Sequence, residues 1–361
     1  MDQVPGLGVI GGGIWARHHM NAVRDLEREG LARLVAMAAR TDQTVSKVSE
    51  EFGIDGTTNW RELLERDDID AISIVTPDHL HREMTIEALR AGKQVIVEKP
   101  MDLTTEGCEE MVRVAREEEA LLFVDFHKRY DKVYQKSRQL IQSGALGSIQ
   151  YGYTYMEDKI VVPRDWFSSW ADKTDPFWFI GVHQVDMLRW VLGSEVRRVT
   201  AHGFKGKLSS LGIDTYDSVH AQLEFVNGAV IPVSISWILP ENFEAVVNQG
   251  TRFVGTEGIL EMDTQDRGFK GCTGNSSTQT YNINSAHVSV AADGEEVHSG
   301  YFVEPIKDFM RLAGHIRRGR SALEFEGQYP GGPDGLEATR VALAVHEALE
   351  QKREITIERK F

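Results

Sequence analysis

The sequence predicts an α/β protein with two domains: first a doubly wound parallel sheet, then an α+β domain built on a mostly antiparallel sheet. Three observations support this prediction. A glycine-rich turn follows a short apolar segment near Met1, strand and helix patterns then alternate through about 125 residues, and strand patterns dominate afterwards. The chain has 361 residues, which is long enough for two domains.

The first element is the glycine-rich turn. Residues Leu7–His19 read L-G-V-I-G-G-G-I-W-A-R-H-H, which is an apolar strand, three glycines and the beginning of a helix. Glycines let the backbone approach a phosphate, and a helix N-terminus offers free N–H groups. The pattern Gly11-x-Gly13-x-x-Ala16 therefore predicts a dinucleotide pyrophosphate site, with Ala16 in place of a third glycine.

Strands and helices then alternate at the spacing of βαβ units. The predicted strands are 7–10, 34–39, 70–75, 95–97 and 121–124, and the predicted helices are 14–27, 60–65 and 85–91. Helices between parallel strands cover both faces of a sheet. We therefore expect a dinucleotide-binding Rossmann domain over residues 1–125.

The pattern changes after about residue 124. A helix is predicted at 135–144, strands at 149–156, 197–201, 218–225, 229–238, 251–255 and 259–263, and a further helix at 305–316. Asn227-Gly228 predicts a hairpin in which both turn residues have positive φ. Residues 268–299 are rich in Gly, Ser, Thr and Asn, which predicts loops with short edge strands. Residues 126–361 are thus expected to form the second domain.

The composition indicates which partners the protein avoids and in which cellular compartment it works. The net charge of −15 opposes nonspecific binding to nucleic acid or to an anionic membrane. The two cysteines, Cys108 and Cys272, cannot form a disulfide framework, and no apolar run reaches the ~18 residues of a membrane span. The first strand begins too close to Met1 for a signal peptide. We therefore expect a cytoplasmic protein.

Four motifs together resemble the glucose–fructose oxidoreductase / inositol dehydrogenase / MocA family. They are Gly11-x-Gly13, Thr76-Pro77 with His81, Glu98-Lys99-Pro100, and Gly181-x-His183-x-x-Asp186. The resemblance covers nearly the whole chain. It implies a Rossmann domain that carries NAD or NADP, and a C-terminal domain whose large open sheet often forms dimers or tetramers. It also implies an oxidoreductase that acts on the CH–OH groups of sugars or cyclitols.

The residues expected to bind the cofactor follow strands of the first domain. They are Gly11, Gly12, Gly13, Ile14, Trp15, Arg40, Thr41, Thr76, Pro77, His81, Glu98 and Lys99. The second strand ends Ala38-Ala39-Arg40-Thr41, without the carboxylate that binds the ribose 2′-hydroxyl of NAD. Arg40 and Thr41 suit a 2′-phosphate, so NADP is favoured. NAD remains open, because Arg40 can stack on adenine and Asp42 supplies a carboxylate.

Two residues are expected to carry acid–base chemistry. Lys99 follows a strand, so it should project at the carboxyl edge of the sheet, and its Glu-Lys-Pro context in the resemblance indicates action on the substrate hydroxyl. His183 has an imidazole that titrates near working pH, and Asp186 shares its helix face. The family often has an aspartate four residues before this histidine, where this chain has Phe179.

That departure leaves several interpretations open. Asp186 could orient His183, or an acid from Glu157-Asp158 or Asp165 could replace the missing aspartate. Loss of dehydrogenase activity in this chain is a further alternative. Two other functions also stay open: a redox-neutral, NAD-dependent glycoside hydrolase, and a non-catalytic sensor that binds a dinucleotide or sugar.

The substrate pocket is expected to draw on an aromatic segment over 158–178, because aromatic faces suit the C–H patches of a sugar ring. The expected substrate-binding residues are Lys99, Tyr155, Arg164, Trp166, His183 and Asp186. Tyr151, Tyr153 and Tyr155 share one strand face, which is either a pocket wall or a subunit interface.

No metal site is expected from the histidine pairs along the chain. His18 and His19 are adjacent on a helix and cannot converge on one ion. The pair His79-x-His81 lacks further ligands at zinc-site spacing.

Overall fold

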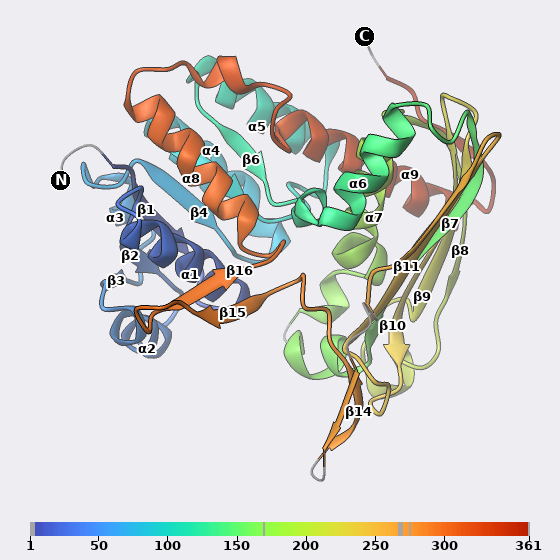
Figure 1. Ribbon diagram of the computed structural model, residues 1–361, viewed down its shortest axis with the longest axis horizontal. Helices are drawn as coiled ribbons and strands as arrows, with labels where there is room; N and C mark the ends of the chain where they lie inside the picture. Colours follow the sequence, from blue (N-terminus) through green and yellow to red (C-terminus); the bar gives the residue numbers. More distant parts are fainter. Residues whose placement is uncertain (1–3, 169, 266–269, 274–275, 360–361) are drawn as a thin grey trace. The chain divides into compact units, whose positions relative to one another are not determined.

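The computed structural model describes residues 4–168, 170–265, 270–273 and 276–359. The chain forms two compact units (Figure 1). The first unit holds the residues up to 130 together with 284–339, and the second holds 131–283 together with the residues from 340 onward.

The first unit is built on a parallel sheet. Its strands are β1 (Gly6–Ile10), β2 (Arg33–Ala38), β3 (Asp55–Thr57), β4 (Ala71–Ile74), β5 (Gln94–Val97) and β6 (Leu122–Val124). They lie in the order β3-β2-β1-β4-β5-β6, and every pair is parallel. The direction of winding reverses between β1 and β4, and ligands of such sheets bind beyond the carboxyl ends of the strands at that point. The predicted doubly wound sheet is confirmed.

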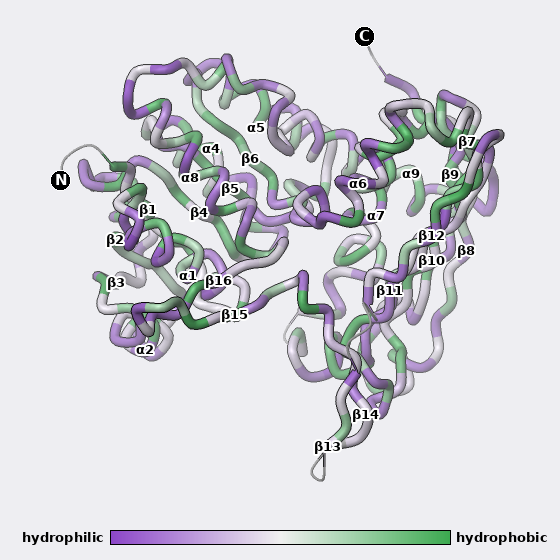
Figure 2. The backbone as a smooth tube through the Cα atoms, viewed as in Figure 1, coloured by the Kyte–Doolittle hydropathy of each residue, from purple (hydrophilic) through white to green (hydrophobic). Residues whose placement is uncertain are grey.

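Helices cover both faces of this sheet. They include α1 (Ile14–Arg28), α2 (Asp42–Phe52), α3 (Arg61–Leu64), α4 (His81–Arg90) and α5 (Thr105–Glu117). Every residue of β1 and β4 is buried, and Figure 2 shows these strands as largely hydrophobic. Strands covered on both faces bury both sets of alternating side chains, which explains their continuous apolar runs.

A later segment of the chain returns to the first unit. It holds β15 (His287–Val290), β16 (Glu296–Ser299), α8 (Glu304–Arg317) and the first turns of α9 (Gly332–Gln351). Phe309 and Met310 of α8 join Met20 and Leu26 of α1 in one hydrophobic cluster, and Lys307 Nζ lies 2.8 Å from a carboxylate oxygen of Asp25. The compact units therefore divide the chain differently from the single boundary expected after residue 125, because α8 covers α1 with its apolar stripe.

The second unit contains a seven-stranded sheet. Its strands are β7 (Ile149–Lys159), β8 (Val196–Phe204), β9 (Ser218–Phe225), β10 (Val230–Leu239), β11 (Val247–Gly255), β12 (Ile259–Asp263) and β17 (Ile355–Thr356). Their order is β12-β11-β7-β10-β9-β8-β17, and β7 with β10 is the parallel pair among antiparallel neighbours. The predicted mostly antiparallel sheet is confirmed.

The two faces of this sheet differ. The helices α6 (Lys132–Gln142) and α7 (Val182–Leu192) pack together on one face. On that face Thr154 of β7 donates its hydroxyl to Gln184 of α7 at 2.8 Å. Side chains alternate along a strand, so Tyr151, Tyr153 and Tyr155 point to the other face, where Tyr151 and Tyr153 are 54% and 41% exposed.

The prediction that both turn residues of the Asn227-Gly228 hairpin have positive φ is wrong for one of them. The β9–β10 hairpin has positive φ at Gly228 but not at Asn227, whose side chain instead accepts a hydrogen bond from the N–H of Ala229. The glycine-rich segment contains the ribbons β13–β14 (Lys270–Thr273, Ser276–Thr280) and β15–β16, which matches the expected short strands where the structure describes it. Residues 268–269 and 274–275 also belong to the segment predicted as loops with short strands, but they lie outside the residues that the structure describes.

Candidate active site

The glycine-rich turn has the geometry of an anion cradle. Gly11 has φ +134°, and a Cβ there would lie 2.2 Å from the carbonyl oxygen of Val75, so only glycine fits. Gly13 is the N-cap of α1, and a Cβ there would meet nothing within 4 Å. Among the residues that the structure describes, no side chain caps α1, and the first turn of this helix has no acidic residue. Its N–H groups and positive dipole end are therefore available to a phosphate.

The end of β2 lies against this turn. A Cβ on Gly12 would lie 3.4 Å from Cβ of Ala39 and 2.4 Å from a methyl of Thr44. Arg40 is exposed, and within the described parts of the chain its guanidinium has no ion pair. Thr41 caps α2, because its hydroxyl oxygen accepts a hydrogen bond from the N–H of Thr44 at 3.3 Å. Arg40 is therefore available to a ligand, whereas the hydroxyl oxygen of Thr41 already accepts a hydrogen bond from α2.

His81 connects two loops at the carboxyl edge. Its Nδ1 lies 2.8 Å from the carbonyl oxygen of Pro100, and its Nε2 lies 2.9 Å from that of Thr76. Carbonyl oxygens only accept, so both contacts are hydrogen bonds when both ring nitrogens carry protons. His81 therefore holds the Thr76-Pro77 loop against the Glu98-Lys99-Pro100 loop, and both ring nitrogens are occupied by backbone rather than by a ligand.

Lys99 lies two residues after the end of β5, on the carboxyl side of the strand, where it was expected. It is buried, and its backbone N–H donates to Oε2 of Glu98 at 3.2 Å. Asp78 is also close enough to be influenced by the Lys99 ammonium: burial raises the pKa of the Asp78 carboxyl, while His81 and Lys99 act against that rise. Two carboxyl groups thus accompany the lysine at the carboxyl edge of the parallel sheet.

Sequence reasoning missed a buried trio beside Lys99. His19 of α1, Glu98 after β5 and Asp125 after β6 come together, all buried. Burial alone would lower the pKa of His19, but Asp125 and Glu98 raise it to about 9. The trio therefore attracts positive charge. The sequence did contain a signal for this trio, since an acidic residue directly follows each of two neighbouring parallel strands. Such positions lie close together at the carboxyl edge of a sheet.

Trp15 belongs to an aromatic group in the first unit. Its ring stacks on His127 with centroids 5.8 Å apart, and meets the ring of Phe302 edge to face at 4.7 Å. His127 also stacks on Tyr301. Burial and the nearby Lys128 and Lys99 hold the pKa of His127 well below its usual value, so its imidazole is neutral. The structure therefore gives Trp15 a packing role beside the first turn of α1.

In the second unit, His183 and Asp186 lie on α7, and both are buried. A carboxylate oxygen of Asp186 lies 3.8 Å from Nη1 of Arg189. Arg189 also binds Glu195, with Nε 2.6 Å from the carboxylate. Asp186 is thus part of an ion-pair chain along and beyond the helix.

Phe179 lies on the π-helix η5 (Phe177–Gly181), directly before α7. Its ring packs against Phe167 at 4.7 Å and against Trp237 at 5.7 Å between centroids. The position that often carries an aspartate in the family is therefore part of an aromatic cluster in this chain.

The remaining predicted substrate residues come from two elements, Tyr155 from β7 and both Arg164 and Trp166 from the π-helix η3 (Val162–Trp166). Arg164 pairs with Asp165 and with Glu241, so its charge is already compensated by two carboxylates. Trp166 is 53% exposed. Tyr155 lies on the sheet face opposite the one that α7 covers, so it does not share a face with His183.

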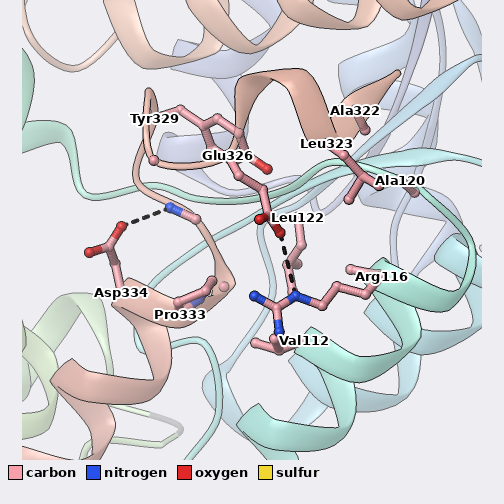
Figure 3. Close-up of a pocket in the computed structure, with 14 residues that line it drawn as sticks. Val112, Arg116, Ala120, Leu122, Ala322, Leu323, Glu326, Tyr329, Pro333 and Asp334 are labelled. Carbon is pink, nitrogen blue, oxygen red and sulfur yellow. Dashed lines mark hydrogen bonds and ion pairs between the residues drawn. The ribbon is translucent and has the colours of Figure 1, made fainter.

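A separate cavity of about 250 Å³ lies along β6 in the first unit (Figure 3). Its wall includes Val112 and Arg116 of α5, Leu122 of β6 and Tyr329. Arg116 pairs with Glu326 across it at 3.4 Å. It contains none of the predicted site residues, and Leu122 is the first residue of β6, whereas ligands of such sheets bind at the carboxyl ends. This cavity is not the candidate site.

Comparison with known families identifies the class of protein. Residues 6–126 match the family model described as an oxidoreductase family with an NAD-binding Rossmann fold, and residues 134–261 match the GFO/IDH/MocA C-terminal domain. The chain belongs to the GFO/IDH/MocA oxidoreductase family. In the described parts of the chain, no helix combines the length and apolar character that crossing a membrane requires.

Relatives and solved structures agree with this assignment. The inositol 2-dehydrogenase of Rhizobium meliloti is 26% identical over 360 residues, covering 97% of this chain and 98% of that protein. The scyllo-inositol 2-dehydrogenase (NAD(+)) of Bacillus subtilis is 29% identical over 236 residues, covering 62% of this chain and 67% of that protein. The structure of scyllo-inositol dehydrogenase from Lactobacillus casei with bound NAD(H) and scyllo-inositol has the same fold, with a TM-score of 0.77 at 20% identity over 98% of this chain and 99% of that chain.

Proposed function

We propose that the protein is an NAD(P)-dependent dehydrogenase acting on a CH–OH or carbonyl group of a sugar, sugar derivative or cyclitol. Its family and its inositol dehydrogenase relatives support this reaction class. The observation that carries the proposal is the uncapped N-terminus of α1 at Gly13, in the same unit as a buried lysine at the carboxyl edge of the sheet.

The chain's own groups would handle the proton. A bound nicotinamide would supply the hydride acceptor. The Lys99 amino group takes the proton of the substrate hydroxyl as the carbonyl forms, and returns it in the reverse direction. The burial of Lys99 supports this role, because a proton transfer shielded from water is not lost to solvent.

His183 is proposed as a second acid–base or hydroxyl-binding group, and Asp186 as its neighbour on α7. Phe179 supplies no carboxylate to stabilise an imidazolium, so the transfer of the substrate proton depends mainly on Lys99.

Trp166 and Arg164 are proposed to border the substrate. Because Asp165 and Glu241 already compensate the Arg164 charge, Arg164 would bind hydroxyl groups rather than an anionic substrate.

NADP is proposed as the preferred cofactor, with NAD as the alternative. Ala39, whose Cβ lies beside Gly12 of the glycine-rich turn, offers no carboxylate to repel a 2′-phosphate, and the next residue is the exposed Arg40. Since Thr41 caps α2, the phosphate contact would fall mainly to Arg40. The NAD(H) bound to the Lactobacillus casei scyllo-inositol dehydrogenase belongs to that protein and supports the alternative.

A homodimer or homotetramer is proposed to form through the open face of the second sheet. Tyr151 and Tyr153 are large exposed side chains on that face. Tyrosine is enriched in subunit interfaces because its ring is apolar and its hydroxyl can remain hydrated.

The test is a panel of sugars and cyclitols, each mixed with the purified protein and either NAD or NADP. We expect reduced nicotinamide to accumulate with at least one polyol, followed by its absorbance. Hydrolysis of a glycoside without any net reduced nicotinamide would instead identify the redox-neutral hydrolase. Binding of dinucleotide without turnover of any compound would identify a sensor.

A further inference from the structure

Three buried polar side chains meet at the carboxyl edge of the parallel sheet. His19 comes from the second turn of α1, Glu98 follows β5 and Asp125 follows β6. His19 is fully buried, and Asp125 and Glu98 are 1% and 8% exposed. One ligand atom from each lies within 4.8 Å of the others.

Each member of the trio has a buried polar atom without a hydrogen-bond partner in the described part of the chain. These atoms are Nε2 of His19, Oε1 of Glu98 and Oδ1 of Asp125. Buried polar atoms are nearly always satisfied by protein, water or an ion, so three such atoms in one place indicate a missing common partner. By contrast, Nδ1 of His19 lies 2.8 Å from the hydroxyl oxygen of Ser73.

The spacing of the trio fits a metal better than direct hydrogen bonds. Nε2 of His19 lies 3.5 Å from Oε1 of Glu98 and 3.4 Å from Oδ2 of Asp125. N–H···O hydrogen bonds are mostly about 2.9 Å long. A tetrahedral ion with bonds of about 2.1 Å separates its ligand atoms by about 3.4 Å, which is the observed spacing of the imidazole from each carboxylate.

We propose that His19, Glu98 and Asp125 form a binding site for a divalent metal ion of the zinc class, with a fourth position for water. Imidazole and carboxylate are ligands that zinc accepts, and the two carboxylates together balance its charge. When Nδ1 of His19 donates its proton to the hydroxyl oxygen of Ser73, Nε2 presents its lone pair to the ion, and such outer partners orient metal-bound histidines.

This site lies beyond the proposed hydride transfer and does not depend on it. The expectation that no metal binds rested on histidines that are neighbours in the sequence. In the structure His19 instead meets acids from the ends of two strands. The ion would connect α1, which begins at the glycine-rich turn, to the loop that carries Lys99.

The test is metal binding to the whole protein. We would remove bound metal with a chelator and titrate the protein with Co²⁺, whose tetrahedral complexes absorb visible light, and then with Zn²⁺ in competition. We expect one Co²⁺ per chain with a tetrahedral spectrum, displaced by Zn²⁺. Failure of the correctly folded wild-type protein to bind one equivalent would overturn the proposal, whatever the variants do.

Variants locate the site. Asp125→Asn and His19→Ala should weaken Co²⁺ binding by at least about 100-fold, whereas Ser73→Ala should keep the stoichiometry and weaken binding about 10–100-fold. His79→Ala, an exposed histidine of the same unit, is the matched control and should bind as the wild type does. Circular dichroism checks that each variant is folded. Unchanged binding in folded Asp125→Asn and His19→Ala would overturn the proposal, because the ion would then bind elsewhere in the protein.

Discussion

The carboxylate of Asp175 accepts a hydrogen bond from Nε2 of His346, and its other oxygen accepts from the N–H of Phe177. Asp175 therefore accepts from the N–H groups of Phe177 and Trp178 at the beginning of the π-helix that leads to α7, and joins this helix to α9 within the second unit. The imidazole of His346 also stacks on Trp178, with centroids 5.2 Å apart. This Asp–His pair was absent from the sequence predictions.

The pair should make stability depend on pH. Burial alone lowers the pKa of His346, but Asp175 raises it above the ordinary value of 6.5. A histidine whose pKa is raised by folding stabilises the protein fully below its unfolded pKa, and this contribution is lost as pH rises through the folded pKa. We therefore expect the free energy of unfolding to fall as the pH rises above about 6.5, until His346 has lost its proton in the folded protein as well.

Urea unfolding across that pH range measures the effect. His346→Phe keeps the ring beside Trp178 but cannot bind a proton, so its stability should decline less than that of the wild type. A smaller decline should remain, because the pKa of His19 is also raised, to about 9. The exposed His79→Ala is the control and should retain the full decline. The same slope in His346→Phe as in the wild type would show that another group titrates.

Lys99→Ala should lower turnover about 10²–10⁴-fold, the usual loss for one acid–base group, with little change in dinucleotide affinity. Steady-state kinetics with the best substrate and a separate binding titration measure the two effects. Lys47→Ala, on the exposed face of α2, is the control. Near-normal turnover of Lys99→Ala would refute the assignment.

Arg40→Ala should weaken NADP by about 1.5–3 kcal/mol while leaving NAD nearly unchanged, because only NADP offers a 2′-phosphate to the guanidinium. Fluorescence titration with both reduced cofactors gives the two affinities. Arg90→Ala, an exposed arginine at the end of α4, controls for net charge. Equal weakening of both cofactors would mean that Arg40 stacks on adenine.

His183→Ala should reduce turnover less than Lys99→Ala does. The reason is that Phe179 packs among aromatic rings and gives His183 no carboxylate at the position where relatives often have one. Both variants are compared at saturating substrate and cofactor. A larger loss in His183→Ala would indicate that another acid, such as Asp186, supports the histidine.

The sequence predicted the sheets better than the helices and the site. The strands β9 and β12 were predicted at the residues where they occur, because turns with glycine separate their alternating apolar residues. The helix α2 was missed because Val48 is the one buried residue of that element, so its apolar pattern is weak. The helix α9 was not predicted either, although Pro333 in its first turn is typical of a helix start.

Sequence patterns could not predict the features that depend on contacts between residues far apart in the chain. The return of α8 to the first unit depends on contacts such as that of Lys307 with Asp25, far apart in the chain. The trio likewise combines residues from three places in the chain: His19 lies on α1, Glu98 follows β5 and Asp125 follows β6. The glycine-rich turn and Lys99 were placed correctly along the fold, because they follow the ends of the parallel strands β1 and β5 within two residues.

The measurement that tests the account most directly is dinucleotide binding to Gly13→Val. A Cβ at Gly13 meets no atom within 4 Å, and the residue has an extended backbone with φ −80°, so the variant should fold as the wild type does. The added side chain would instead fill the space where the pyrophosphate must approach the N–H groups of α1. Calorimetric titration with reduced dinucleotide should give one site per chain in the wild type and affinity at least about 10-fold weaker in the variant, with unchanged thermal unfolding. Equal affinity in the two proteins would contradict the proposed cofactor site and the dehydrogenase built on it.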